Sequence, residues 1–285
     1  MRIITLTTDF GLQDWFVGTM KGVILGFNPR AAIVDITHDI PPGDIRAGAF
    51  ALAASYRYFP RGTIHVAVVD PGVGTKRNAL AVRTRDYTFI GPDNGVLSFA
   101  LRNEKVKSIR RIANEKLFLH PVSRTFHGRD IFAPVAAHLS RGLAFARVGP
   151  SLNDFTKLPW PEPRIGTRGL EGEIIHVDRF GNAITNLPAS AIKSHSTIRV
   201  RGASVPVVEN YQAVPPGHLA AVPGSSDFLE LAVNGGSAAR KLRLRPSNKV
   251  TLLASHPPLT LSPSQKAREK QAEQGSKLHF DGPQE

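Results

Sequence analysis

Residues 63–77 have the sequence TIHVAVVDPGVGTKR, an apolar run followed by a loop with two glycines and an arginine. The run at 63–69 has the length and composition of a buried strand, and Asp70 follows it directly. Asp9 likewise follows a strand-like run at residues 3–7. In sheets covered by helices, ligands bind beyond the carboxyl ends of the strands. Asp70 and Asp9 therefore stand where such a fold places its binding groups.

Strand and helix patterns alternate from residue 1 to residue 148. We expect strands at residues 3–7, 32–36, 63–69, 79–83, 88–90 and 107–112. We expect helices at residues 15–25, 44–58, 96–102 and 130–140. This alternation predicts an α/β domain at 1–148 with a largely parallel sheet covered by helices.

The pattern of predicted elements changes after residue 148. Residues 149–169 include the segment LPWPEP at 158–163, whose three prolines prevent regular structure, so we predict a Pro-rich linker there. From 170 to 256, short strand-like runs separated by turn residues predict a small all-β domain, barrel-like or a sandwich. Residues 262–285 are polar and predict a disordered tail or a frayed helix.

The composition excludes several classes of protein. The 285 residues include no cysteine, which excludes a disulfide scaffold, a cysteine zinc site and thiol catalysis. The histidines and carboxylates show no metal-ligand spacing, so we expect no metal. The first residues lack the order of a signal peptide, and no apolar run approaches the roughly 18 residues of a membrane span. We expect a soluble, cytoplasmic protein.

The chain is strongly basic, with 36 Lys and Arg residues against 23 Asp and Glu residues and a net charge of +13. A basic surface attracts phosphates, so nucleic-acid binding is one interpretation. The other is a general basic bias or a surface adapted for solubility, because the basic residues are spread widely and only modest clusters occur at 102–116 and 240–249. No signature of a nucleic-acid-binding module is present, and we do not expect nucleic acid as a partner.

Polar groups in glycine-containing loops are the candidates for a functional site, but each has an ordinary structural explanation. An aspartate before Pro71-Gly72 forms a standard turn, and an arginine at position 77 is often a solvated charge. His127 is a candidate general base because its unperturbed pKa is near 6.5, although a single histidine is more often structural. The segment DRFGN at 178–182 suits a hairpin turn, or the recognition of a purine by its ring and amide.

Five motifs in one order carry a family resemblance: TTDFG at 7–11, VDPGVG at 69–74, GPDNG at 91–95, TFHGRD at 125–130 and DRFGN at 178–182. In these motifs the chain resembles the S-adenosyl-L-methionine (SAM) hydroxide adenosyltransferases, also called SAM hydrolases. The fluorinase and chlorinase that use SAM are relatives of this family. The resemblance runs from residue 3 to about residue 255 and implies an α/β domain followed by a small β-barrel. It also implies a homotrimer with active sites between subunits.

The resemblance implies roles for individual residues. Asp70, Arg77 and His127 would handle the attacking water, and Asp9 would hold the ribose hydroxyls. The adenine would be bound by Phe180 and Tyr211 on its two faces and by Asn182 and the backbone near Val233 and Gly235 at its edge. The methionine end would meet Asp178, Ser225 and Ser226. Further substrate contacts would come from Thr125, Phe126 and Glu230.

The identities of two residues favour a hydrolase over a halogenase. The related halogenases carry tyrosines where Asp70 and His127 stand, and the fluorinase has a serine aligned with Gly128. A carboxylate repels a halide but accepts a hydrogen bond from water. We therefore predict hydrolysis of SAM to adenosine and L-methionine by attack of water at the ribose 5′-carbon, with no cofactor. The alternatives are a SAM-dependent halogenase, a SAM or adenosine sensor without turnover, and a basic nucleic-acid-binding protein.

Overall fold

The computed structural model describes residues 2–193 and 195–253. The chain divides into two compact units, Met1–Pro161 and Glu162–Glu285, and each is described by itself. The boundary falls inside the predicted linker at 149–169, but strands occupy both ends of that segment: β7 (Ser151–Leu152) and β8 (Arg164–Gly166). The predicted tail at 262–285 lies outside the described residues.

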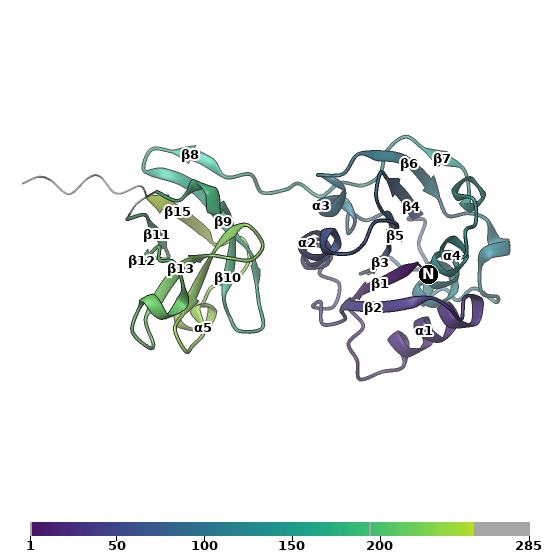
Figure 1. The fold of residues 1–285 in the computed structure, drawn as a ribbon, viewed down its shortest axis with the longest axis horizontal. Helices are drawn as coiled ribbons and strands as arrows, with labels where there is room; N and C mark the ends of the chain where they lie inside the picture. The colour runs from purple at the N-terminus through teal and green to yellow at the C-terminus, as the bar shows by residue number, and fades with distance from the viewer. Residues whose placement is uncertain (1, 194, 254–285) are drawn as a thin grey trace, which may run out of the picture. The chain divides into compact units, whose positions relative to one another are not determined.

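The first unit is built on a seven-stranded sheet with the order β2-β1-β3-β5-β4-β6-β7 (Figure 1). Its other strands are β1 (Ile3–Thr8), β2 (Ala32–Thr37), β3 (Ile64–Val68), β4 (Ala79–Thr84), β5 (Thr88–Pro92) and β6 (Val106–Arg111). Its α-helices are α1 (Phe16–Phe27), α2 (Ile45–Ser55), α3 (Ser98–Leu101) and α4 (Ala133–Ser140). Short helical turns are η1 (Tyr56–Tyr58), η2 (Glu115–Leu117), η3 (Gly128–Phe132) and η4 (Phe145–Val148).

The prediction of a largely parallel sheet was wrong, because the sheet is mixed. Strands β2, β1, β3 and β5 run parallel, whereas β4, β6 and β7 join the sheet through antiparallel pairs. The cause is the short connection between β4 and β5, in which the Thr84 N–H bonds to the Tyr87 carbonyl. A connection this short returns the chain as a hairpin, whereas a parallel neighbour needs a long crossover.

Alternate residues of β3 and its extension face two separate cores. Val66 and Val68 belong to the core that contains α1 and α4, whereas Ala67 and Val69 belong to the core that contains α2 and α3. The apolar run at 63–69 is therefore buried on both faces, as in a central parallel strand. Asp70 is the first polar residue after it, at the carboxyl end of the sheet's central strands.

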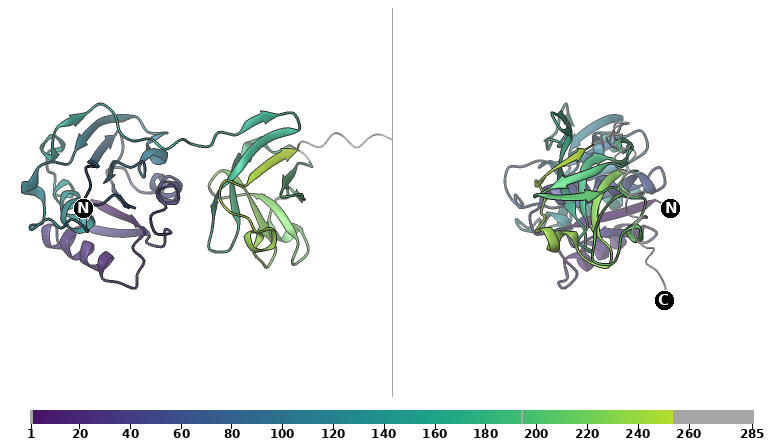
Figure 2. Two further views of the ribbon diagram at one scale, coloured as in Figure 1. Left: turned by 180° about the vertical axis from the view of Figure 1, so that it is seen from behind. Right: turned by 90° about the vertical axis from the view of Figure 1, so that its left-hand side faces the viewer.

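The second unit is a nearly closed antiparallel sheet, seen from behind in Figure 2. Its strands follow the order β12-β11-β15-β9-β10-β14-β13, and β8 pairs with β9 outside this path. A bridge between Val207 and Ala221 joins the chain after β12 to β13 and brings the two ends of the sheet together. The strands are β9 (Gly169–Val177), β10 (Ala183–Pro188), β11 (Thr197–Val200), β12 (Ala203–Pro206), β13 (Leu219–Pro223), β14 (Phe228–Val233) and β15 (Lys249–Leu253), and the helical segments are η5 (Ala189–Ala191), η6 (Tyr211–Ala213) and α5 (Ala238–Leu242).

Candidate active site

Arg77 joins Asp70 and His127 into one contact set in the first unit. Its Nε donates to Asp70 Oδ1 at 2.9 Å, and its Nη2 donates to Asp70 Oδ2. The same Nη2 lies 2.8 Å from His127 Nδ1. The side chains of Arg77 and Asp70 are only 10% and 5% exposed, so this two-point ion pair is shielded from solvent.

The contact with Arg77 determines the tautomer of His127. A guanidinium has only hydrogen-bond donors, so Nδ1 of His127 must accept the bond. In the neutral ring the hydrogen is then on Nε2. Burial lowers the pKa of His127, and the positive charge of Arg77 lowers it further, against smaller opposing effects of Asp70, Asp130 and the Ser123 backbone. The imidazole is therefore neutral at pH 7, and its basic nitrogen is already engaged.

A close approach of two loops makes this contact set possible. Gly74 has φ +75° and lies against the backbone of Arg124, just before the motif that contains His127. A Cβ at position 74 would lie 2.2 Å from the Arg124 carbonyl oxygen. Glycine is thus required there for both its conformation and its lack of a side chain.

Two residues to which the sequence analysis assigned no role hold these loops. Asn94 donates from Nδ2 to the Val69 carbonyl at 2.8 Å, next to Asp70. Asp130 is fully buried and accepts from the Ser123 N–H at 2.8 Å while it pairs with Arg129. Asn94 lies in the motif GPDNG, and Asp130 lies in the motif TFHGRD. Their membership of these motifs was the signal in the sequence that could have identified them.

The segment after His127 is a π-helical turn, η3, that precedes α4. π-helical turns are rare and often occur at functional sites. Within this motif Phe126 is 8% exposed and packs edge-on against Phe10 and Phe16, with ring centroids 5.7 and 5.0 Å away. The side chain of Phe126 therefore has a packing role, whereas Thr125 is exposed and bonds to Ser123.

Asp9 lies at the end of β1, beside the end of β3, because Thr8 pairs with Val68. Its Oδ2 accepts from the Gly43 N–H at 2.8 Å. A Cβ at Gly43 would lie 3.8 Å from Pro71, so the loop that holds Asp9 also contacts the loop that begins at Asp70. The structure thus brings Asp9 into the neighbourhood of the Asp70–Arg77–His127 contact set.

In the second unit, residues 178–182 form the hairpin turn between β9 and β10. Asp178 accepts from the Asn182 N–H at 2.8 Å and from Asn182 Nδ2 at 3.2 Å. Gly181 has φ +85° and leaves room for Ser237, whose Oγ would lie 1.9 Å from a Cβ at position 181. The turn presents Phe180, which is 78% exposed.

Tyr211 and Glu230 are joined by a hydrogen bond from the phenol to the carboxylate. Burial raises the pKa of Tyr211 to about 12, and the bond to Glu230 and the charges of Glu230 and Asp178 act in the same direction. The effect of Asp178 indicates that the hairpin turn lies near Tyr211. In the part of the chain that the structure describes, the rings of Phe180 and Tyr211 do not contact each other.

The remaining predicted residues lie on β14 and in the turn between β13 and β14. Ser226 Oγ is buried and has no hydrogen-bond partner among the described residues, whereas Ser225 is exposed. Val233 ends β14, and its carbonyl accepts from the Gly236 N–H at 3.0 Å. All the predicted residues of the second unit thus occur in one sheet and its turns.

Over residues 2–193 and 195–253, no group of three or more His, Cys, Asp or Glu side chains is placed to hold a metal ion. The same residues contain no helix whose length and hydropathy would allow it to cross a bilayer.

Replacing Gly74 with alanine tests the close approach of the loops. We expect G74A to lower the free energy of unfolding clearly more than G62A, because both positions have positive φ but only position 74 lacks space. The shared conformational penalty is about 1 kcal/mol. Urea unfolding of both variants measures the difference, and equal losses would show that contact with Arg124 is unimportant.

The histidine environment predicts a pH dependence. His127 should titrate below 6.5 in the folded protein, because burial and Arg77 disfavour its charged form. The unfolded chain then binds more protons below pH 6.5, so the contribution of His127 to stability falls as the pH decreases through that range. Histidine NMR titration, assigned with H127Q, measures the pKa, and a value at or above 6.5 would contradict this environment.

Both units match known protein families. A family described as the SAM hydroxide adenosyltransferase N-terminal domain matches residues 4–149, and its C-terminal domain matches residues 172–251. A Thermus thermophilus protein named (R)-S-adenosyl-L-methionine hydrolase is 40% identical over 260 residues, covering 89% of this chain and 100% of the relative. A Salinispora tropica protein of the same name is 39% identical, with 88% and 97% covered.

More distant and structural relatives agree with this match. A fluorinase from an Actinoplanes species is 28% identical and covers 65% of this chain and 71% of its own length. The crystal structure of an uncharacterized conserved protein from Thermotoga maritima has a TM-score of 0.84 and 38% identity, with 88% of this chain and 100% of that chain covered. The resemblance inferred from the five motifs is thereby confirmed, and the chain belongs to the SAM hydroxide adenosyltransferase family.

Proposed function

We propose that the protein hydrolyses S-adenosyl-L-methionine to adenosine and L-methionine. The relatives of highest identity described above are named for this activity, and the fluorinase is more distant. The observation that carries the proposal is the Asp70–Arg77–His127 contact set, which supplies a carboxylate for water where the related halogenases carry tyrosine.

The reaction is an in-line displacement at the ribose 5′-carbon. A water oxygen bonds to this carbon, the carbon–sulfur bond breaks, and sulfur keeps the electron pair. The sulfonium becomes a neutral thioether, so the leaving group needs no acid. The enzyme must align the water and accept its proton, and alignment alone can lower the barrier by about 7–11 kcal/mol in favourable cases.

Asp70 is the group that accepts the proton in this proposal. His127 Nδ1 is engaged by Arg77, whereas each Asp70 oxygen has a lone pair left beside its bond to Arg77. The water becomes acidic as its oxygen bonds to carbon, so a carboxylate suffices late in the step. Arg77 holds both oxygens of Asp70 in place for this proton transfer, and His127 positions Arg77.

The remaining site residues are proposed to contact the substrate, as the family resemblance implies. Asp9 would hold the ribose hydroxyls through its second oxygen, and Phe180 and Tyr211 would stack on the adenine. The unpartnered Ser226 hydroxyl supports a polar ligand atom at the methionine end, together with Asp178 and Ser225. Asn182, the backbone at Val233, Thr125, Phe126 and Glu230 complete the proposed set, which needs no cofactor.

The assignment of Asp70 predicts a selective loss of turnover. We expect D70A to lower kcat by about 10²–10⁴-fold, the usual contribution of a proton acceptor, while KM for SAM changes by only a few fold. Adenosine and methionine are measured by chromatography in chloride-free buffer, with D154A as control because Asp154 is exposed and forms a surface ion pair with Lys157. An equal loss of SAM binding and turnover would reject the role of Asp70.

The same assay separates the alternatives. SAM binding without turnover in the unsubstituted protein would indicate a sensor. A halogenated product that appears only when chloride or fluoride is added would indicate a halogenase.

We also propose that the protein is a cytoplasmic homotrimer with active sites between subunits, as the family resemblance implies. The exposure of Trp15, Ile165 and Phe180, at 71%, 93% and 78%, supports burial of these side chains in an assembly.

The assembly predicts a mass near three times the 30.9 kDa of one chain in light scattering. It also predicts complementation between two inactive variants. When D70A and F180A chains are co-expressed, some sites between subunits combine two intact halves and regain activity. A monomeric mass, or a mixture without activity, would contradict sites between subunits.

A further inference from the structure

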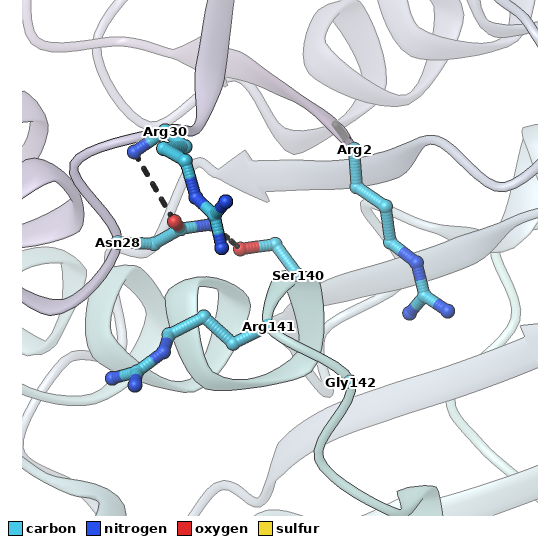
Figure 3. A pocket seen from close by; sticks show the side chains of 6 residues that line it. All are labelled: Arg2, Asn28, Arg30, Ser140, Arg141 and Gly142. Atoms are coloured by element: carbon cyan, nitrogen blue, oxygen red, sulfur yellow. Dashed lines mark hydrogen bonds between the residues drawn. The ribbon is translucent and has the colours of Figure 1, made fainter.

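A pocket of about 740 Å³ lies in the first unit, at the end of the sheet opposite the Asp70–Arg77–His127 contact set (Figure 3). It is formed by the residue before β1, the chain after α1 and the end of α4. Its lining residues are Arg2, Asn28, Arg30, Ser140, Arg141 and Gly142. β1 runs from this pocket to Asp9, and its rise of about 3.3 Å per residue places the two roughly 20 Å apart. The pocket is therefore separate from the Asp70–Arg77–His127 contact set.

The three arginines of the pocket have no acidic partner among the described residues. Arg2 donates to the Leu139 carbonyl at 2.9 Å, and Arg141 donates to the Phe27 carbonyl at 3.1 Å. These bonds satisfy carbonyls at the ends of α4 and α1, but each uses one of the five N–H groups of a guanidinium. The Arg30 side chain makes no hydrogen bond to the described residues, so helix capping does not explain its presence.

Two neutral side chains, Asn28 and Ser140, line the pocket together with the arginines and are hydrogen-bonded to each other. Asn28 is 8% exposed, and its Nδ2 donates to Ser140 Oγ at 2.7 Å. The Arg30 N–H donates to Asn28 Oδ1 at 3.2 Å, which fixes the amide orientation. Figure 3 shows Arg2 on one side of the pocket and Arg30 and Arg141 on the other. The three guanidinium groups thus lie on two sides of a polar surface whose hydrogen-bonding groups are already oriented.

The positive charges also act on a neighbouring arginine. The pKa of Arg83 is lowered first by burial and then by the charge of Arg2. Like charges gathered in this way destabilise one another, and a bound anion offsets this repulsion.

We propose that this pocket binds a compact polyanion that contains two or more linked phosphate groups. Guanidinium groups match phosphate oxygens in pairs of hydrogen bonds, and the lining offers no carboxylate to repel an anion. The spread of three arginines over a pocket of about 740 Å³ suits several phosphates better than one. The lining has no aromatic side chain on which a base could stack, so recognition rests on the phosphates. Inorganic polyphosphate and the phosphate tail of a nucleotide share this chemistry.

The test is calorimetric titration of the full-length protein with inorganic tripolyphosphate at constant ionic strength. We expect one site per chain, and R30Q should weaken binding by about tenfold or more, since a hydrogen bond to a charged group is lost. R199Q is the matched control, because Arg199 is exposed on β11 in the other unit and its loss changes the net charge equally. The control should change affinity by less than about twofold, as expected for a distant exposed charge. R2Q and R141Q provide further variants if R30Q does not fold.

Three further probes distinguish the sources of the ligand. Orthophosphate should bind at least tenfold more weakly than tripolyphosphate, because it engages fewer arginines. ATP that binds like tripolyphosphate supports recognition of the phosphates alone, and tighter ATP binding identifies a nucleotide as the source. No binding of tripolyphosphate, or equal losses in R30Q and R199Q, would overturn the proposal. Binding of a 12-nucleotide single strand that R30Q weakens more than tripolyphosphate binding would also overturn it, in favour of a nucleic-acid surface.

This site is independent of SAM hydrolysis. R30Q should therefore retain turnover of SAM, and its binding defect is measurable whether or not the protein hydrolyses SAM.

Discussion

The guanidinium of Arg77 lies between a carboxylate and an imidazole, and the chemistry of the site depends on this shielded contact. Arg77 holds both oxygens of Asp70 and one nitrogen of His127. Because a guanidinium only donates hydrogen bonds, the contact also decides which atoms remain free to receive a proton. The carboxylate keeps lone pairs, whereas the basic nitrogen of the imidazole is occupied. Because Asp70 keeps free lone pairs and His127 does not, we favour Asp70 over His127 as the proton acceptor in the proposed hydrolysis.

Backbone geometry places the three groups as much as side-chain chemistry does. Gly74 allows one loop to reach the Arg124 backbone, and hydrogen bonds of Asn94 and Asp130 hold the loops. The ends of β1 and β3 add Asp9 to the same neighbourhood. A loop site of this kind is precise because rigid strands and buried hydrogen bonds support it.

Some basic residues of the chain are gathered at one place in the fold, which the net charge alone does not show. Arg2, Arg30 and Arg141 come from three distant segments and line one pocket, without acidic partners in the described part of the chain. These three arginines lie at the amino ends of the parallel strands, and the candidate active site lies at their carboxyl ends. In the two proposals made above, the two ends of one sheet bind two kinds of ligand, a sulfonium substrate and a polyanion.

The sequence by itself determined the alternation of strands and helices, the β-rich second unit and the family, because these depend on periodicity and on motifs that are local in the chain. It also marked Asp70, Arg77 and His127, because each lies in a glycine-containing loop beside an apolar run. Only the tertiary structure decided that half of the first sheet is antiparallel, since strand direction depends on how a short connection turns. Only the structure showed that Phe126 packs in the core, that Arg77 occupies His127 Nδ1, and that residues 2, 30 and 141 share a pocket. These facts depend on contacts between residues far apart in the chain, which local patterns do not specify.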